Sequence, residues 1–152
     1  MSQSNHVVCT ACGAINRVST DKDAAAGKCG KCGTALFSGT PADMSASNLE
    51  RQIAKTDIPV LVDVWAPWCG PCRVMSPQFA GAASKAEPGM RFLKLNSDEA
   101  PELSTRLAIR GIPTMLLFEG GKEVARVSGA MSSSDILKWA EGARSKSAGG
   151  SA

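Results

Sequence analysis

All six cysteines of this 152-residue chain stand in three Cys-x-x-Cys pairs, and this spacing constrains the fold more than any other feature of the sequence. The pairs are Cys9/Cys12, Cys29/Cys32 and Cys69/Cys72. The first two pairs lie in a glycine- and lysine-containing stretch, and a glycine follows each of them. The third pair lies between an apolar run and an expected helix. We interpret the first four cysteines as metal-holding thiolates and the last two as a redox-active pair.

The segment 9–36 contains no aromatic and few aliphatic side chains, so it needs a metal or disulfides to fold. Its Cys-x2-Cys-x16-Cys-x2-Cys spacing fits a four-thiolate zinc site, and Gly13 and Gly33 allow backbone amides to turn toward the sulfurs. Four soft ligands favour tetrahedral Zn²⁺ without an open position. We therefore expect one structural zinc ion per chain, held by Cys9, Cys12, Cys29 and Cys32. His6 is expected to be a bystander in a loose tail of residues 1–8.

Three alternatives to zinc remain open for this segment: two disulfides or further redox pairs, an iron–sulfur cluster, and a nucleic-acid-binding ribbon. Residues before 40 include four basic and two acidic side chains, and those after it thirteen and twelve, so neither part has the basic field that nucleic-acid binding needs. The N-terminus lacks the features of a signal peptide, and no apolar run is long enough to span a bilayer. Free thiolates persist best in a reducing compartment, so we expect a soluble, cytoplasmic protein.

From residue 41 onward, strand and helix signals alternate. We expect helices over 47–56, 72–86, 100–107 and 132–145, with Ser47 as the N-cap of the first. Strands are expected over 60–65, 91–96, 114–118 and 122–127, the last two joined by a turn at Gly120-Gly121. This order predicts an α/β domain with a mixed sheet over 41–145. Residues 1–36 form a separate zinc-ribbon module with its N-terminal tail, and 146–152 are expected to be a disordered tail.

The third cysteine pair follows a strand and begins a helix. This position puts the Cys69 sulfur beside unpaired backbone N–H groups and the positive end of the helix dipole, which favour thiolate. Cys72 lies one turn further in and can reach back to form a disulfide, so only Cys69 is expected to be exposed. Gly70 and Pro71 keep the turn compact. Two structural cysteines with this spacing by chance are the plain alternative, which the flanking tryptophans disfavour.

Residues 41–145 resemble the thioredoxin family. The match rests on Trp68-Cys69-Gly70-Pro71-Cys72 together with Val62-Asp63-Val64-Trp65, Pro77, Lys94, Gly111-Ile112-Pro113-Thr114 and Gly129-Ala130. The resemblance implies a thioredoxin fold, with a mixed central sheet flanked by helices, and protein-disulfide reductase activity. By resemblance, Cys69 is the nucleophile, Cys72 the resolving thiol, Asp63 a buried proton acceptor and Lys94 its charge partner. It also implies a cis-Pro113 facing the disulfide, with Trp68, Gly70, Pro71, Ile112 and Gly129 at the substrate surface.

The residues alone leave three of these roles open. Asp63 lies in an apolar strand, so it is either a buried acid with a raised pKa or an ordinary hydrogen-bonded residue at a strand end. Lys94 can equally be a solvated side chain on a half-exposed strand. Pro113 would be presumed trans, because only about one X-Pro bond in twenty is cis.

A four-cysteine ribbon containing Cys-Gly-x-x-Asn-Arg-Val at 12–18, joined to such a domain, resembles the second, zinc-containing type of bacterial thioredoxin. No nucleotide-binding motif is present, so we expect no bound nucleotide cofactor and electrons delivered by an NADPH-dependent thioredoxin reductase. The expected protein is a monomer that acts on disulfide-containing proteins. Oxidation of the zinc ligands would release the metal and make the ribbon a redox sensor. The alternatives are a disulfide oxidant or isomerase, and a zinc-ribbon adaptor with a supporting thioredoxin domain.

Overall fold

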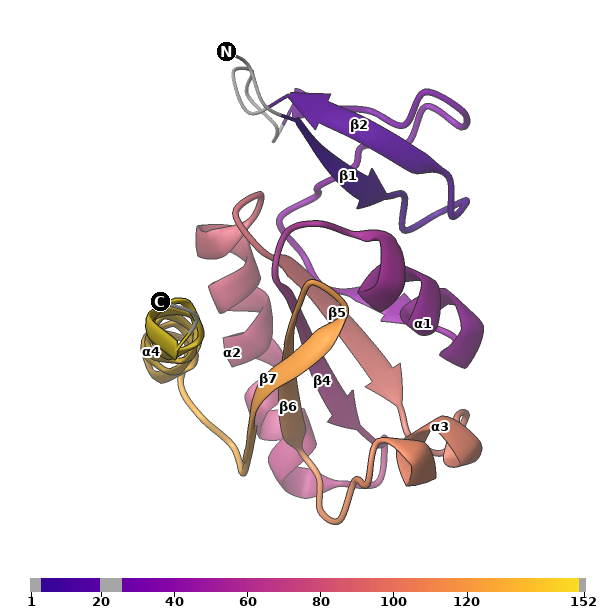
Figure 1. Ribbon diagram of the computed structural model, residues 1–152. Coiled ribbons are helices and arrows are strands. Elements are labelled where there is room, and N and C mark those ends of the chain that lie inside the picture. The colour runs from indigo at the N-terminus through magenta and orange to yellow at the C-terminus, as the bar shows by residue number, and fades with distance from the viewer. Residues whose placement is uncertain (1–3, 20–25, 151–152) are drawn as a thin grey trace.

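The computed structural model describes residues 4–19 and 26–150, and it begins with a small two-stranded sheet (Figure 1). Strands β1 (Ser4–Val8) and β2 (Ile15–Ser19) pair antiparallel, with Val8 opposite Ile15. The expectation of a loose tail over 1–8 is therefore wrong for residues 4–8, while 1–3 lie outside the described residues. The tail prediction failed because β1 is stabilised by partners distant in sequence, which a local reading does not see.

A five-stranded sheet forms the centre of the larger domain. Its strands are β3 (Ala42–Met44), β4 (Val60–Trp65), β5 (Arg91–Asn96), β6 (Thr114–Glu119) and β7 (Lys122–Ser128), in the order β3-β5-β4-β6-β7. β3, β5 and β4 are parallel, whereas β6 is antiparallel to both β4 and β7. The mixed sheet expected from the sequence is confirmed. The short edge strand β3 was not expected.

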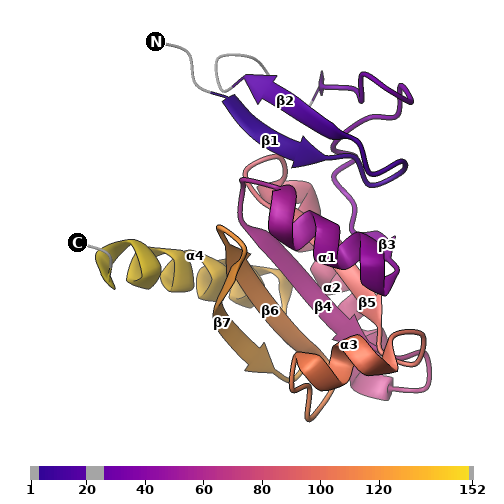
Figure 2. The same cartoon turned by 45° about the vertical axis from the view of Figure 1, so that its right-hand side comes forward.

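Four helices cover the two faces of this sheet: α1 (Ala46–Lys55), α2 (Gly70–Ala86), α3 (Pro101–Arg106) and α4 (Ser133–Gly150). Figures 1 and 2 show α1 and α3 on one face and α2 and α4 on the other. Alternate residues of β4 point to opposite faces, so Val62 packs with Leu49 and Leu103, whereas Leu61 packs with Phe79 and Ile136. Both faces of β4 are therefore buried, as its apolar residues at both odd and even positions indicate.

The helix boundaries differ from the sequence prediction by one or two residues, and the end of α4 differs by more. The N-cap of α1 is Ser45 rather than Ser47, because the Ser45 side chain accepts a hydrogen bond from the Asn48 N–H at 3.2 Å. β3 ends at Met44, and Ser45 is still extended, with φ −73° and ψ 167°, so the helix begins at Ala46. α4 continues to Gly150, beyond the expected helix end at 145, and residues 151–152 lie outside the described residues. Once a helix is nucleated, each added residue gains one hydrogen bond, which allows this extension.

The N-terminal module, defined here as described residues 4–37, packs against one end of the larger domain (Figure 1). Its small core contains Val7, Leu36 and Phe37, so Phe37 belongs to the module. The buried Arg91 guanidinium donates to the carbonyl oxygens of Leu36 at 2.6 Å and Val8 at 3.0 Å. Arg91 begins β5, so the module covers the end of the sheet opposite the Cys69/Cys72 pair, which follows the far end of β4.

Candidate active site and candidate metal centre

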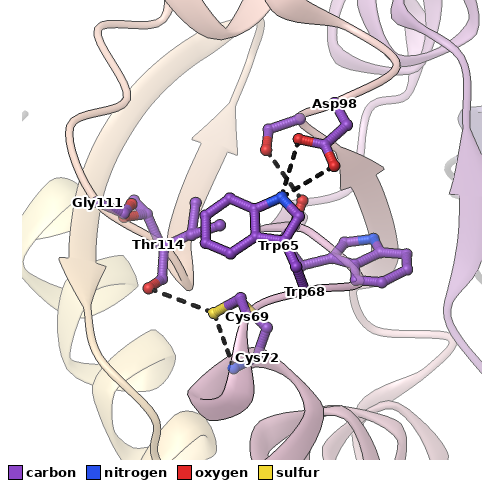
Figure 3. The surroundings of a disulfide bond; sticks show 9 residues. Trp65, Trp68, Cys69, Cys72, Asp98, Gly111 and Thr114 are labelled. Atoms are coloured by element: carbon purple, nitrogen blue, oxygen red, sulfur yellow. Dashed lines mark hydrogen bonds between the residues drawn. A yellow bond between two sulfur atoms is a disulfide. The ribbon is translucent and has the colours of Figure 1, made fainter.

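Cys69 and Cys72 are joined by a disulfide at the beginning of α2 (Figure 3). Cys69 is the N-cap residue of this helix, and its sulfur accepts the backbone N–H of Cys72 at 3.2 Å. A thiolate in this position is stabilised by that N–H group and by the helix dipole. The expectation that only Cys69 is exposed is wrong, because both residues are buried, with exposed fractions of 5% for Cys69 and 2% for Cys72. Their different positions on the helix, rather than exposure, distinguish them.

The loop before β6 forms the other side of the disulfide. The Cys69 sulfur lies 3.7 Å from the carbonyl oxygen of Ile112, and the Ile112–Pro113 peptide bond is cis. The N–H of Gly129, which has a positive φ of 103°, donates to the Pro113 carbonyl at 2.9 Å. The fold therefore brings Cys69, Cys72, Ile112, Pro113 and Gly129, which the sequence analysis selected, to one place.

Trp68 projects from the loop just before Cys69 and is 71% exposed. Its indole Nε1 donates to both carboxylate oxygens of Asp98, at 3.0 and 3.2 Å (Figure 3). Val74, on the first turns of α2, is 68% exposed. Neither Asp98 nor Val74 was predicted from the sequence to belong to the site. Asp98 lies thirty residues after Trp68 and belongs to no sequence motif, so its contact could not be predicted. Val74 is an apolar residue two positions after Cys72, and this closeness to the active pair could have indicated it.

Asp63 is fully buried in the middle of β4, on the same face as Leu61 and therefore toward α2. Neither of its carboxylate oxygens has a hydrogen-bond partner within the described part of the chain. Burial raises the pKa of Asp63 to about 7, against the opposing effect of the Lys94 charge. Of the two readings left open by the sequence, the structure therefore favours the buried acid over a hydrogen-bonded residue at a strand end.

Lys94 lies on β5 directly beside Asp63 in the strand register. Its ammonium group donates to Ser76 Oγ at 3.1 Å and lies 4.5 Å from the centroid of the Trp65 ring. The contacts of the ammonium group are therefore with Ser76 and Trp65, and its positive charge acts on the Asp63 carboxyl only through space. Lys94 is half-buried, so it is not the freely solvated side chain that the sequence left open as an alternative.

A second group of reactive side chains lies in the N-terminal module. The sulfurs of Cys9, Cys12, Cys29 and Cys32 all lie within 4.8 Å of one another. Cys9 and Cys32 are 3.6 Å apart, as are Cys12 and Cys29. Sulfurs at the corners of a tetrahedral zinc site are about 3.8 Å apart, because a Zn–S bond is about 2.3 Å long. The four thiols thus fit a zinc ion in both number and spacing.

The two cysteine knuckles, residues 9–14 and 29–34, have the same backbone hydrogen bonds. The N–H of Cys9 donates to Ala14 and that of Cys29 to Thr34, while the N–H of Gly13 and of Gly33 donate back to the respective first cysteine. Gly13 and Gly33 have φ angles of 78° and 79°, which L-residues rarely adopt. The Cys9 and Cys29 sulfurs each accept a backbone N–H two residues on, at 3.4 Å. These donors are those that metal-bound thiolates need.

The side chain of Asn16 adds to this repeat. The Asn16 amide, with the backbone N–H groups of Cys32 and Lys31, lowers the pKa of Cys29 to about 6.

His6 is not part of the cysteine cluster. The backbone N–H of His6 donates to Asp57 Oδ2 at 2.6 Å, and the backbone carbonyl of His6 accepts the backbone N–H of Asp57 at 2.8 Å. His6 is thus a bystander to the cysteine cluster, as expected, but it lies in a strand rather than a loose tail and helps to join β1 to the larger domain.

A cysteine pair at the start of a helix, opposite a cis-proline loop and on a mixed sheet covered by two helices on each face, defines a thiol–disulfide oxidoreductase of the thioredoxin fold. The Thioredoxin family model matches residues 40–142, and the chain belongs to the thioredoxin family. A second model, described as Thioredoxin 2, N-terminal, is a zinc ribbon and matches residues 8–34, which contain all four clustered cysteines.

Similar proteins cover both the whole chain and the larger domain. Thioredoxin C-3 of Corynebacterium nephridii is 41% identical over 133 residues, which span 88% of this chain and 91% of that protein. Thioredoxin 1 of Nostoc sp. is 38% identical over 100 residues, 66% of this chain and 94% of the relative. A crystal structure of chloroplastic thioredoxin z superposes with a TM-score of 0.64 at 28% identity, covering 70% of this chain and 96% of that one.

Thioredoxin f from spinach chloroplasts gives the same TM-score of 0.64 at 29% identity, over 70% of this chain and 88% of that structure. The likeness to both plastid proteins is thus confined to part of the chain, whereas Thioredoxin C-3 matches most of it. Among residues 4–19 and 26–150, no helix is both long and apolar enough to cross a membrane.

Proposed function

We propose that this protein is a general protein-disulfide reductase whose active pair is Cys69 and Cys72. The observation that carries the proposal is the Cys69 sulfur at the start of α2, bonded to Cys72, hydrogen-bonded by a backbone N–H and facing the cis-Pro113 loop. Such a sulfur leaves and attacks readily as a thiolate, which is the form that exchanges with disulfides.

In the first step, the Cys69 thiolate attacks one sulfur of a substrate disulfide. The substrate S–S bond breaks, one substrate sulfur leaves as a thiolate, and a mixed disulfide joins Cys69 to the other. The Cys72 thiolate then attacks the Cys69 sulfur, which releases the second substrate thiolate and forms the Cys69–Cys72 disulfide. Two electrons pass to the substrate, and the protein is left oxidised.

Asp63 is the proposed base for the second step. It takes the proton of the Cys72 thiol, and its pKa of about 7 suits proton exchange near neutral pH. The position of Asp63 on the α2-facing side of β4 supports this role, since Cys72 lies on the first turn of α2. Lys94 is proposed to modulate the charge of Asp63 rather than to pair with it.

The proposed substrate surface surrounds the disulfide and consists of Trp68, Gly70, Pro71, Ile112, Pro113 and Gly129. Trp68 and Val74 expose apolar area beside the reactive sulfur, which suits a protein substrate that must be held without strict sequence selection. The electron donor is proposed to be an NADPH-dependent thioredoxin reductase, and the active species a monomer in the cytoplasm.

The four clustered cysteines are proposed to hold one structural zinc ion per chain. When bound, zinc would supply the folding energy that a module with so small a core lacks. Elemental analysis beside thiol counting tests this site: one zinc with four reduced thiols is the expected result. Metal-free protein with these sulfurs in disulfides would refute it. Loss of zinc after mild peroxide would support the further role as a redox sensor.

The reductase proposal is tested by a turnover assay with NADPH, thioredoxin reductase and a protein disulfide. We expect NADPH consumption that requires both Cys69 and Cys72. An oxidant or isomerase would instead introduce or rearrange disulfides in a reduced substrate, and an adaptor would show neither reaction. Absence of reductase turnover by folded protein would contradict the proposal.

A further inference from the structure

The side chain of Asn16 bridges the two cysteine knuckles. Asn16 lies on β2, just after the first knuckle, and its Nδ2 donates to the Ala14 carbonyl at 3.2 Å. The same Nδ2 lies 3.4 Å from the Cys29 sulfur, to which it donates. Its Oδ1 accepts the backbone N–H of Gly30 at 2.9 Å. One amide thus contacts the first knuckle, a candidate metal ligand and the backbone of the second knuckle.

This amide has no counterpart in the second knuckle. Asn16 stands four residues after Cys12, and the residue four positions after Cys32 is the buried, apolar Leu36. Both knuckles nevertheless have the same backbone hydrogen bonds. A knuckle therefore folds without an amide at this position, which argues that the role of Asn16 is not to form its own knuckle but to act on the other one.

The contacts of Asn16 are those of an outer residue of a metal site. An N–H donor to a thiolate ligand orients the sulfur and stabilises its metal-bound form, and the loss of such a donor typically lowers metal affinity about 10–100-fold. Cys29 accepts the side-chain N–H of Asn16 and the backbone N–H of Lys31, each at 3.4 Å, and the backbone N–H of Cys32 also acts on its sulfur. The bond from Gly30 fixes the rotation of the amide, because Oδ1 must face Gly30 for Nδ2 to face the sulfur.

We propose that Asn16 is a positioning residue of the four-cysteine site, which holds Cys29 and the second knuckle against the first and so slows the loss of zinc. The inference rests on the proposed zinc site. Asn16 touches no metal position itself and acts through the Cys29 sulfur and the Gly30 backbone.

Two variants separate its functions. Asn16→Asp keeps an acceptor for Gly30 but removes the donor to Cys29, whereas Asn16→Leu copies the second knuckle and removes both. Asn5→Asp is the matched control, because this substitution makes the same change of charge as Asn16→Asp. Asn5 lies on the neighbouring strand β1 and is not in the cysteine cluster. The measurement is the rate at which reduced, zinc-loaded protein transfers its metal to a chromogenic chelator.

We expect Asn16→Asp and Asn16→Leu to release zinc at least about 10-fold faster than the parent, and Asn5→Asp to match the parent. Cobalt-substituted Asn16→Asp should show altered sulfur-to-metal charge-transfer absorption, which a merely structural role would leave unchanged. Asn16→Gln keeps the amide one methylene further out and should retain zinc better than Asn16→Leu.

The outcomes are distinguishable. A parent protein without zinc would remove the proposed metal site itself. A zinc-loaded parent whose Asn16→Asp variant releases metal at the parental rate would overturn the role of Asn16 alone. If Asn16→Asp were isolated without metal, the zinc-release rates of Asn16→Gln and Asn16→Leu would be compared instead. Equal rates for these two variants would also overturn the role of Asn16.

Discussion

The most consequential single residue outside the cysteine pair is Asp63. Its folded-state pKa of about 7 lies above the ordinary value of 3.8, because burial disfavours the charged carboxylate. Between these two values the unfolded chain releases the proton while the folded protein retains it, so stability falls as pH rises from about 4 to about 7. Below that window Asp63 is protonated in both states and has no such effect.

Asp63→Asn should therefore stabilise the oxidised protein near neutral pH. The uncharged amide avoids the cost of burying a carboxylate. We expect the free energy of unfolding to rise by roughly 2–4 kcal/mol at pH 8, and this gain should shrink toward pH 4. Denaturant unfolding at several pH values measures it. Asp43→Asn, at an exposed position on β3, is the control and should stay within about 0.5 kcal/mol of the parent. A destabilised Asp63→Asn protein would contradict this prediction.

The same change should slow catalysis. If Asp63 is the base for Cys72, resolution of the mixed disulfide in the parent should accelerate as pH rises through about 7, as the carboxyl loses its proton. Asp63→Asn should lose this pH dependence and resolve the mixed disulfide about 10²-fold more slowly, because general-base catalysis typically contributes at least that factor. Stopped-flow measurement of substrate release tests the step. An unchanged pH profile would exclude Asp63 as the base.

At the scale of elements, the beginning of β5 joins the N-terminal module to the larger domain. Arg91 is 2% exposed, its guanidinium lies 4.4 Å from the Phe37 ring centroid, and its two hydrogen bonds both go to carbonyl oxygens of the module. Burial lowers the pKa of Arg91, and the nearby Glu87 opposes this effect. Gln52 of α1 adds a hydrogen bond from Nε2 to the Val8 carbonyl at 3.0 Å.

Arg91→Met should therefore destabilise the protein by about 2–4 kcal/mol, since it keeps most of the packing but leaves the Leu36 carbonyl without its buried charged donor. Arg51→Met is the matched control. Arg51 also donates to the module, from Nε to the Gly13 carbonyl at 2.6 Å, but it is exposed, and its loss should cost less than about 1 kcal/mol. Chemical denaturation compares the two variants. Equal stabilities would show that Arg91 does not join the two parts.

Elements set by a local residue pattern were predictable from the sequence, whereas those that depend on distant partners were not. The strands over 60–65 and 91–96 were predicted at their observed bounds, because their β-branched and apolar residues satisfy a local pattern. β1 was missed because it depends on Asp57 and Thr56, about fifty residues away. Arg91 was missed because nothing local distinguishes a buried arginine from a solvated one at a strand start.

The candidate sites show the same division. The cysteine spacings and the thioredoxin motif indicated both clusters, because thiol chemistry requires fixed intervals along the chain. The contacts of Asn16, Ser76 and Asp98 were not predictable, since each depends on a side-chain direction set by tertiary packing. The cis bond at Pro113 was implied only by the family resemblance and is confirmed.

At the scale of the whole molecule, the module covers the end of the sheet opposite the active disulfide, so removal of residues 1–36 should leave reductase activity of the folded fraction largely intact. The fold should nevertheless become less stable, because Arg91 and Gln52 lose their partners. Activity per folded molecule and the thermal midpoint are measured together. A truncated protein that is as stable as the parent, or folded but inactive, would contradict this account.

The central claim, that Cys69 attacks and Cys72 resolves, is tested most directly by trapping. Cys69→Ser and Cys72→Ser variants are incubated with a disulfide-containing protein and examined by intact mass spectrometry under non-reducing conditions. The account predicts that Cys72→Ser forms a mixed disulfide with substrate through Cys69, released by dithiothreitol, because the attacking thiolate remains and the resolving thiol is gone. Cys69→Ser should form none. Equal trapping by both variants, or trapping by Cys69→Ser alone, would contradict it.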